Sequence, residues 1–194
     1  MARPQFFLVA GPNGGGKSTL TFSIRKRFPE VEVIDPDEIA KGITGSFGTV
    51  EQAQVAAGKL SIKSVREYIE NRSSFLVEST ISGSTYLKYA IKAKEAGFRT
   101  TFIYIGLESP ALSSTRVSER VRLGGHDIPS ADLQRRYYRS LENIKSFIKI
   151  FESAHIYDNS EHYRWVAGYR NGMIHNVSSN VPRWMLTYLP HLKL

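Results

Sequence analysis

The residues with the clearest chemical meaning run from Ala10 to Thr19 and read AGPNGGGKST. From Gly11 to Ser18 they match the pattern G-x-x-x-x-G-K-[ST] of a phosphate-binding loop. Glycines let backbone N–H groups converge on phosphate oxygens, and the N-terminus of the following helix adds its dipole. An apolar run precedes the loop and a helical pattern follows it, as the motif requires. We therefore predict that this loop holds the phosphates of a nucleotide.

Within the loop, Lys17 is expected to reach the β- and γ-phosphates, and the Ser18 hydroxyl to ligate Mg²⁺. The other nucleotide-binding residues of this prediction are Gly11, Asn13, Gly14, Gly15, Gly16 and Thr19. Transfer or hydrolysis of a γ-phosphoryl group is the chemistry that such a loop serves. The rest of the chain must show whether water or a second substrate receives the phosphoryl group.

Three classes of P-loop protein require different motifs beyond the loop. A GTPase needs a guanine-reading N-K-x-D motif, and the chain has none. A motor-type ATPase usually carries an apolar strand that ends in Asp, whereas the nearest such run, FLVEST at 75–80, ends in Glu-Ser-Thr. A small kinase needs a carboxylate base, polar groups that orient the acceptor, and arginines over the transferring phosphoryl group. The chain offers candidates for all three, which favours the kinase.

The candidate base lies in IDPDEIA at 34–40. Asp35 is followed by Pro36 and is predicted to cap a helix rather than to catalyse. Asp37 is the predicted base or acceptor ligand, although an acid that merely favours the helix dipole is the alternative.

Two further candidates end the next apolar run. Glu78 is expected to bind a Mg²⁺-bound water or an acceptor hydroxyl, the alternative being an ion pair. Thr80 is expected to contact the acceptor, the alternative being a cap of a turn.

Six arginines, three acids and no lysine lie between residues 111 and 140. Arginine suits bidentate phosphate contacts, and the acids are too few to pair with all six. Arg116 and Arg120 are spaced i, i+4 and share a helix face, so both are predicted to act on the phosphoryl group, Arg120 also on the acceptor. A salt-bridged surface is the alternative. Because Gly124 and Gly125 could act as a hinge, residues 109–139 are predicted to form a lid.

Apolar runs predict strands at 5–11, 31–35, 74–80, 99–107 and 155–160, and helical patterns separate them. This alternation predicts an α/β P-loop fold with a five-stranded, mostly parallel sheet flanked by helices. A β-hairpin that turns at Asn171-Gly172 and a short helix are expected at about 163–190. Residues 1–194 are predicted to form one kinase domain, with the candidate site residues at the carboxyl ends of the strands.

Composition limits the possibilities further. A hydrophobic content of 41% and a charged content of 23% are typical of a soluble globular protein. There is no cysteine, and no apolar run reaches the roughly 18 residues of a membrane helix. A cytoplasmic location is therefore expected, with no membrane partner. The net charge of +8 favours anionic ligands.

Over roughly residues 5–160, the chain resembles the zeta-toxin-like P-loop kinases. The resemblance depends on an ordered set of segments: GPNGGGKST, IDPDEIA, FLVESTISG, RVSERVRLGGHDIP with LQRRYYRSLEN, and IYDNS. The short, chromosomal-type members are the closer likeness. The resemblance implies ATP and Mg²⁺ as cofactors, a hydroxyl of UDP-N-acetylglucosamine as acceptor, and an antitoxin as partner.

For individual residues, the resemblance implies Lys17 and Ser18 as the phosphate-loop pair and Asp37 as the base. It places Glu78 and Thr80 near the substrate, and Arg116 and Arg120 in the lid. An extra substrate-contacting carboxylate of the plasmid-type toxins has no clear counterpart here, where only Glu67 and Glu70 are available.

Two other functions stay open. The charge permits a kinase or ATPase that acts on a nucleic-acid end, and an acid-free tail after Glu161 carries Arg164, Trp165, Tyr169, Arg170, Arg183 and Trp184. Packing of the hairpin and terminal helix explains these residues equally well, and a separate RNA-binding surface is missing, so a small anionic acceptor is favoured over nucleic acid. The second alternative is a nucleotide-binding partner protein without turnover.

Overall fold

The computed structural model describes residues 3–47, 49–125 and 128–192. Its strands form one sheet in the order β2-β3-β1-β4-β5-β6-β7. The parallel part consists of β2 (Glu32–Ile34), β3 (Phe75–Ser79), β1 (Gln5–Ala10), β4 (Arg99–Gly106) and β5 (Ser153–Asp158). The α/β class and the parallel arrangement are those expected from the sequence.

The predicted number of strands is wrong, because the described residues form a sheet of seven strands rather than five. The predicted hairpin, β6 (Arg164–Arg170) and β7 (Met173–Val177), pairs antiparallel with β5 and extends the sheet. Its turn is the expected one, since Asn171 and Gly172 both have positive φ, 49° and 78°.

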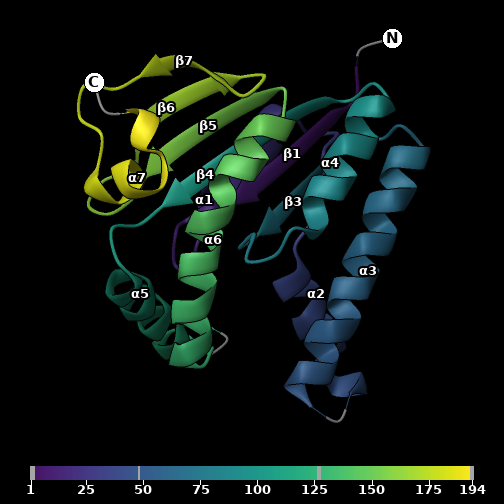
Figure 1. Ribbon diagram of the computed structural model, residues 1–194. Coiled ribbons are helices and arrows are strands. Elements are labelled where there is room, and N and C mark those ends of the chain that lie inside the picture. The colour runs from purple at the N-terminus through teal and green to yellow at the C-terminus, as the bar shows by residue number, and fades with distance from the viewer. Residues whose placement is uncertain (1–2, 48, 126–127, 193–194) are drawn as a thin grey trace.

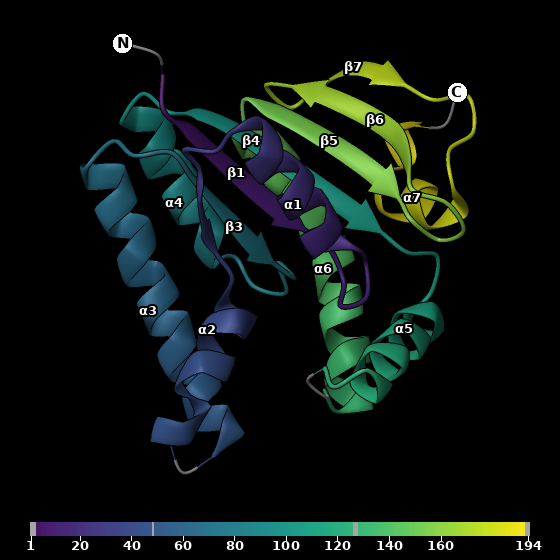
Figure 2. The same ribbon diagram turned by 180° about the vertical axis from the view of Figure 1, so that it is seen from behind.

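Helices cover both faces of the sheet (Figures 1 and 2). α4 (Thr85–Glu95) and α6 (Ser130–Ile150) lie over one face, and α1 (Lys17–Arg27) lies over the other. α3 (Val50–Glu70) packs beside α4, and α7 (Arg183–Tyr188) and the 3-10 turn η2 (Pro190–Leu192) follow the hairpin. No helix among the described residues is both long and apolar enough to cross a membrane.

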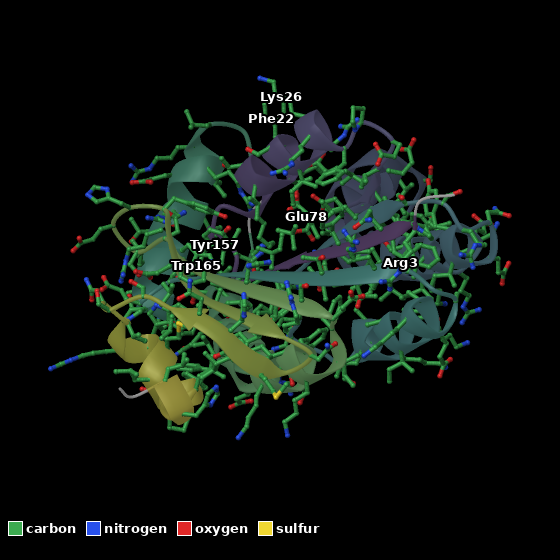
Figure 3. The ribbon with its side chains drawn as sticks, turned by 90° about the horizontal axis from the view of Figure 1, so that it is seen from above. Arg3, Phe22, Lys26, Glu78, Tyr157 and Trp165 are labelled. Carbon is green, nitrogen blue, oxygen red and sulfur yellow. The ribbon has the colours of Figure 1, made fainter. Side chains whose placement is uncertain are left out.

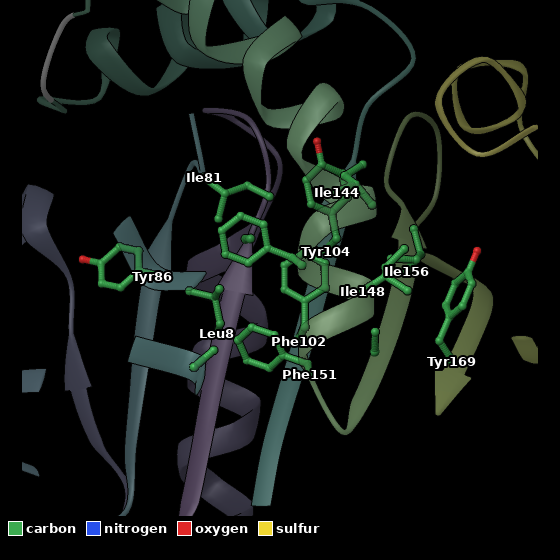
Figure 4. Packing of buried hydrophobic residues seen from close by; sticks show 14 of the residues in the cluster. Leu8, Ile81, Tyr86, Phe102, Tyr104, Ile144, Ile148, Phe151, Ile156 and Tyr169 are labelled. Carbon is green, nitrogen blue, oxygen red and sulfur yellow. The ribbon is translucent and has the colours of Figure 1, made fainter. Parts of the chain in front are cut away.

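The main core lies between the sheet and the helices on the α6 side (Figure 4). An apolar stripe runs along α6, and its members are all buried: Leu133, Tyr137, Leu141, Ile144, Ile148 and, just after the helix, Phe151. Phe102 stacks with Phe147 at a centroid distance of 5.4 Å. A smaller core lies on the α1 side, around Val9 and Ile105.

Two helices near the cavity begin at residues whose side chains cap them. The Asp35 carboxylate accepts a hydrogen bond of 2.9 Å from the Asp37 N–H and starts α2 (Pro36–Ile43), so its predicted role as a cap is confirmed. The Ser109 hydroxyl caps α5 (Pro110–Arg122) in the same way. Figure 1 shows α2 with the start of α3 on one side, and α5 with the start of α6 on the other, beyond the carboxyl ends of the parallel strands.

Candidate active site

The phosphate loop connects β1 to α1 and is shaped by its glycines. Gly16 has φ of +91° at the N-cap of α1, a conformation that other residues rarely adopt. A Cβ on Gly11 would lie 2.1 Å from the Ile105 carbonyl oxygen, so β4 permits only glycine there. Both features hold the loop against the sheet with its helix N-terminus open to a ligand.

Carbonyl groups of the loop are held from outside by three side chains. The Ser113 hydroxyl donates to the Asn13 carbonyl at 2.7 Å, and the Asn159 amide donates to the Gly15 carbonyl at 3.1 Å. Arg116 donates to the Gly14 carbonyl at 3.4 Å. Helix α5 and the segment after β5 therefore position the loop.

A cavity of about 220 Å³ opens in front of the loop. Its lining comes from the loop, α2, the end of β3, α5 and α6, and consists of Asn13, Lys17, Ser18, Asp35, Pro36, Asp37, Glu38, Lys41, Glu78, Ser79, Thr80, Arg120 and Arg136. The cavity thus brings together basic, acidic and hydroxyl groups from segments distant in the sequence.

Lys17 lies at the base of this cavity. Its ammonium group donates to the carbonyls of Gly11 and Pro12 at 3.2 and 3.1 Å. Burial lowers the pKa of Lys17, while the negative charges of Glu78 and Asp37 oppose that shift. A phosphate group in the cavity would offer the ammonium stronger acceptors than the two carbonyls.

Three carboxylates that line the cavity, those of Asp35, Asp37 and Glu78, lie close enough to Lys17 to act on its charge. Desolvation raises the pKa of Asp35 to about 6, and the charges of Glu78 and Asp37 add to the shift. Glu78 is 5% exposed, and it lies in the interior of the molecule while Phe22 and Lys26 project outward from α1 (Figure 3). This concentration of negative charge favours a bound cation.

Ser18 and Glu78 provide oxygen donors for such a cation. The Ser18 hydroxyl donates to Glu78 Oε2 at 3.2 Å, beside the N-terminus of α1. Mg²⁺ prefers oxygen ligands and usually takes one or two from the protein, with the rest from water and phosphate. Although the described residues contain no group of three or more His, Cys, Asp or Glu that could hold a metal ion, one hydroxyl and one carboxylate are within the number of protein ligands that Mg²⁺ usually takes. The donor set therefore fits Mg²⁺.

Asp37 lies where two cavities meet. It lines the cavity of the phosphate loop and also a second one of about 340 Å³, whose other residues are Pro36, Glu51, Gln54, Val55 and Arg136. The side chain is exposed at the start of α2. A carboxylate here can contact a group that enters from either cavity.

Most residues predicted for the site come together in space. Seven of them line the first cavity: Asn13, Lys17, Ser18, Asp37, Glu78, Thr80 and Arg120. Arg116 does not, because its guanidinium holds the Gly14 and Ser160 carbonyls. Thr19 is exposed in the first turn of α1 and is also absent from the lining. The lid range includes residues 126–127, which lie outside the described part.

Arg136 lines both cavities, although Arg116 and Arg120 were the members of the arginine cluster predicted for the site. It belonged to the arginine cluster, but its spacing from Arg120 predicts no shared helix face. Arg120 of α5 and Arg136 of α6 line the same cavity because of how the two helices pack, which their spacing along the chain does not reveal. Lys41, Ser79 and Glu38 were missed as well; Lys41 pairs with Glu38.

Two aromatic residues of the acid-free tail, Tyr169 and Trp184, are buried. Tyr169 and Trp184 are 3% and 6% exposed, so neither offers a surface for stacking. Trp165 is half-buried on β6 opposite Tyr157 of β5, and the two lie next to each other in Figure 3. The structure therefore supports the interpretation that Tyr169 and Trp184 pack in the core.

A parallel sheet, a phosphate loop that leads into α1, and a mixed-charge cavity at the strand ends define a P-loop protein of the kinase type. The zeta toxin family model matches residues 1–167, and the chain belongs to that family. An uncharacterized protein of Haemophilus influenzae is 35% identical over 127 residues, which is 66% of this chain and 88% of that protein.

Solved structures with low sequence identity share the fold. A structure of the PezAT chromosomal toxin–antitoxin system of Streptococcus pneumoniae matches with a TM-score of 0.65 and 20% identity, over 87% of this chain and 72% of that one. The complex AvrRxo1-ORF1:-ORF2 with ATP matches with a TM-score of 0.72 and 17% identity. The match covers 91% of this chain and 61% of that one. At these identities the likeness concerns the fold alone.

Proposed function

We propose that this protein is an ATP- and Mg²⁺-dependent phosphotransferase that moves the γ-phosphoryl group to a hydroxyl of a small anionic acceptor. The position of Asp37 carries the proposal, since this carboxylate lines both the phosphate-loop cavity and the neighbouring one. A donor in the first cavity and an acceptor in the second would meet at Asp37.

In the proposed reaction, the loop amides and Lys17 bind the β- and γ-phosphates, and Arg120 and Arg136 face the transferring group. Asp37 accepts the proton of the acceptor hydroxyl as its oxygen bonds to the γ-phosphorus. The bond to the β-phosphate oxygen breaks, ADP leaves, and Asp37 returns its proton to solvent. Mg²⁺, held by Ser18 and by Glu78 directly or through water, would neutralise phosphate charge when bound.

Membership of the zeta toxin family makes UDP-N-acetylglucosamine the first acceptor to test. The toxin–antitoxin system among the similar structures supports a protein antitoxin as a partner. ATP as donor makes the cytoplasm the expected compartment.

The test measures phosphate transfer from labelled ATP with Mg²⁺, with and without UDP-N-acetylglucosamine, in the wild type and in Asp37→Asn. We expect kcat to fall by about 10²- to 10⁴-fold in the variant, because a general base is lost, while ATP binding persists. Glu38→Gln is the matched control: the carboxylate is adjacent, lines the same cavity and pairs with Lys41.

Each outcome has a separate meaning. Equal activity of Asp37→Asn and wild type would remove Asp37 from the mechanism. If ATP is consumed but no labelled UDP-N-acetylglucosamine appears, the kinase hypothesis survives and this acceptor is excluded. Oligonucleotides with a 5′-hydroxyl would then be tested as acceptors. ATP binding without any turnover would refute the phosphotransferase in favour of a nucleotide-binding partner protein.

A further inference from the structure

Asp158, at the carboxyl end of β5, is a buried carboxylate that the proposed reaction does not use. It is 4% exposed and accepts hydrogen bonds on both oxygens. Oδ1 accepts from the Ser160 hydroxyl at 2.6 Å and from the Trp184 indole N–H at 3.0 Å. Oδ2 accepts from Arg164 through Nε at 3.2 Å and Nη2 at 2.9 Å. The carboxylate therefore joins β5, β6 and α7.

The two residues after Asp158 hold the phosphate loop. The Asn159 side-chain amide donates to the Gly15 carbonyl. The Ser160 carbonyl accepts from Arg116 at 3.0 Å, and the same guanidinium donates to the Gly14 carbonyl. The loop is thus tied to residues 159–160 at two successive glycines.

Trp184 reaches this site from outside the segment matched by the family model, which ends at residue 167. Its indole ring lies against Gly106, where an added Cβ would be 2.2 Å from the ring. The Gly106 carbonyl accepts from the Asn159 N–H at 3.0 Å. Glycine at position 106 therefore admits the indole beside the same turn that holds the phosphate loop.

We infer that α7 acts as a positioning element for the phosphate loop, with Trp184 working through Asp158 and the turn at 159–160. A buried carboxylate depends on its full set of donors, so loss of the indole N–H leaves Oδ1 one donor short. The Ser160 hydroxyl would then be the donor left to Oδ1 among the two that the described contacts give it. The turn would then loosen, and the loop with it.

The inference rests on the nucleotide site of the proposed function, and the first measurement is ADP affinity by calorimetry. Trp184→Phe removes the N–H and keeps an aromatic ring. We expect the Kd of ADP to rise about fivefold, which corresponds to the loss of roughly one hydrogen bond. Tyr169→Phe is the matched control, since it removes a hydroxyl bonded to His191 at 3.2 Å in the same C-terminal segment but away from the turn. Its Kd should equal that of the wild type.

A double-mutant cycle with Asn159→Ala separates positioning from a general loss of stability. If Trp184 acts through the turn, Trp184→Phe should weaken ADP binding much less when Asn159 is already alanine. If the fold-changes in the Kd of ADP caused by Trp184→Phe and Asn159→Ala simply multiply in the double variant, the inference is overturned. Equal changes in this Kd for Trp184→Phe and Tyr169→Phe would overturn it as well.

Hydrogen exchange of the nucleotide-free protein gives a second readout that does not depend on the proposed function. Amides of residues 11–18 should exchange faster in Trp184→Phe than in Tyr169→Phe or the wild type. Unchanged exchange of the loop would refute the positioning role. Absence of ADP binding in the wild type would instead refute the proposed function, and the exchange result would still decide the role of Trp184.

Discussion

The arginines of α5 and the start of α6 differ in what they contact. Arg116 holds backbone carbonyls of the phosphate loop and of Ser160. Arg120 and Arg136 line the cavity, and Arg135 forms a surface ion pair with Asp132 at 2.6 Å. We infer that Arg120 and Arg136 act on the phosphoryl group, whereas Arg116 supports the loop.

Substitution should separate these arginines kinetically. Arg136→Gln should lower kcat by about 10²- to 10³-fold, as expected when one donor to a developing charge is lost. Arg116→Gln should mainly raise the KM for ATP, because it loosens the loop. Arg139→Gln, an exposed residue three positions from Arg136, should leave both constants unchanged. Steady-state kinetics with varied ATP test these expectations, and a kcat effect confined to Arg116→Gln would contradict them.

Asp35 should make stability depend on pH. Its pKa in the folded protein is about 6, above the ordinary value of 3.8, so the folded state binds the proton more tightly than the unfolded state. The charged form therefore destabilises the fold at neutral pH, and this effect is relieved as the pH falls from about 6 to 4. Asp35→Asn retains a cap and removes the charge, so it should be more stable than the wild type at pH 7.

Urea denaturation without nucleotide or metal, at several pH values from 4 to 7, measures this difference in the free energy of unfolding. The advantage of Asp35→Asn should shrink below about pH 6. A difference that stays constant with pH would show that Asp35 does not titrate as stated.

Among the helices, one glycine lies inside a helix and another lies just after the end of one, and the two differ in backbone conformation. Gly58 lies in the middle of α3, with no atom within 4 Å of an added Cβ. Gly97 follows α4 with φ of +83°, a conformation that disfavours a side chain.

The same substitution should therefore have opposite effects at these two positions. Gly58→Ala should raise the free energy of unfolding by about 1 kcal/mol, through helix propensity. Gly97→Ala should lower it by about 1 kcal/mol or more. Chemical denaturation of both variants measures the two changes, and a destabilised Gly58→Ala would indicate an unrecognised contact at α3.

At the scale of the whole molecule, one core joins the two ends of the chain. The main hydrophobic cluster contains Phe6 of β1 and Leu192 of η2, together with residues of α3, α4 and α6. The hairpin and α7 are therefore packed into the same core as the phosphate-loop half.

This packing predicts one cooperative unfolding transition. Both tryptophans, Trp165 and Trp184, lie in the C-terminal segment, whereas far-ultraviolet circular dichroism reports mainly on helices elsewhere. Urea curves from tryptophan fluorescence and from circular dichroism should coincide. A fluorescence midpoint at lower urea would show that the C-terminal segment unfolds separately and would contradict the single-domain prediction.

The net charge of +8 does not come from the cavity. Four basic and four acidic side chains line it: Lys17, Lys41, Arg120 and Arg136, with Asp35, Asp37, Glu38 and Glu78. Formally neutral, the cavity would gain a positive charge with bound Mg²⁺ and so favour a triphosphate.

The α/β class, the strand and helix on either side of the phosphate-loop motif, and the cap at Asp35 could be predicted from the sequence. Each of these depends on neighbours within a few residues, where periodicity and capping chemistry act. That the hairpin extends the sheet to seven strands in the described part of the chain became clear only from the structure, because strand pairing depends on backbone partners that composition does not specify. The tertiary structure also decided that Arg136 faces the cavity, that Arg116 holds the loop, and that Trp184 meets Asp158. Those contacts join segments distant along the chain, and only the packing of the core brings them within hydrogen-bonding distance.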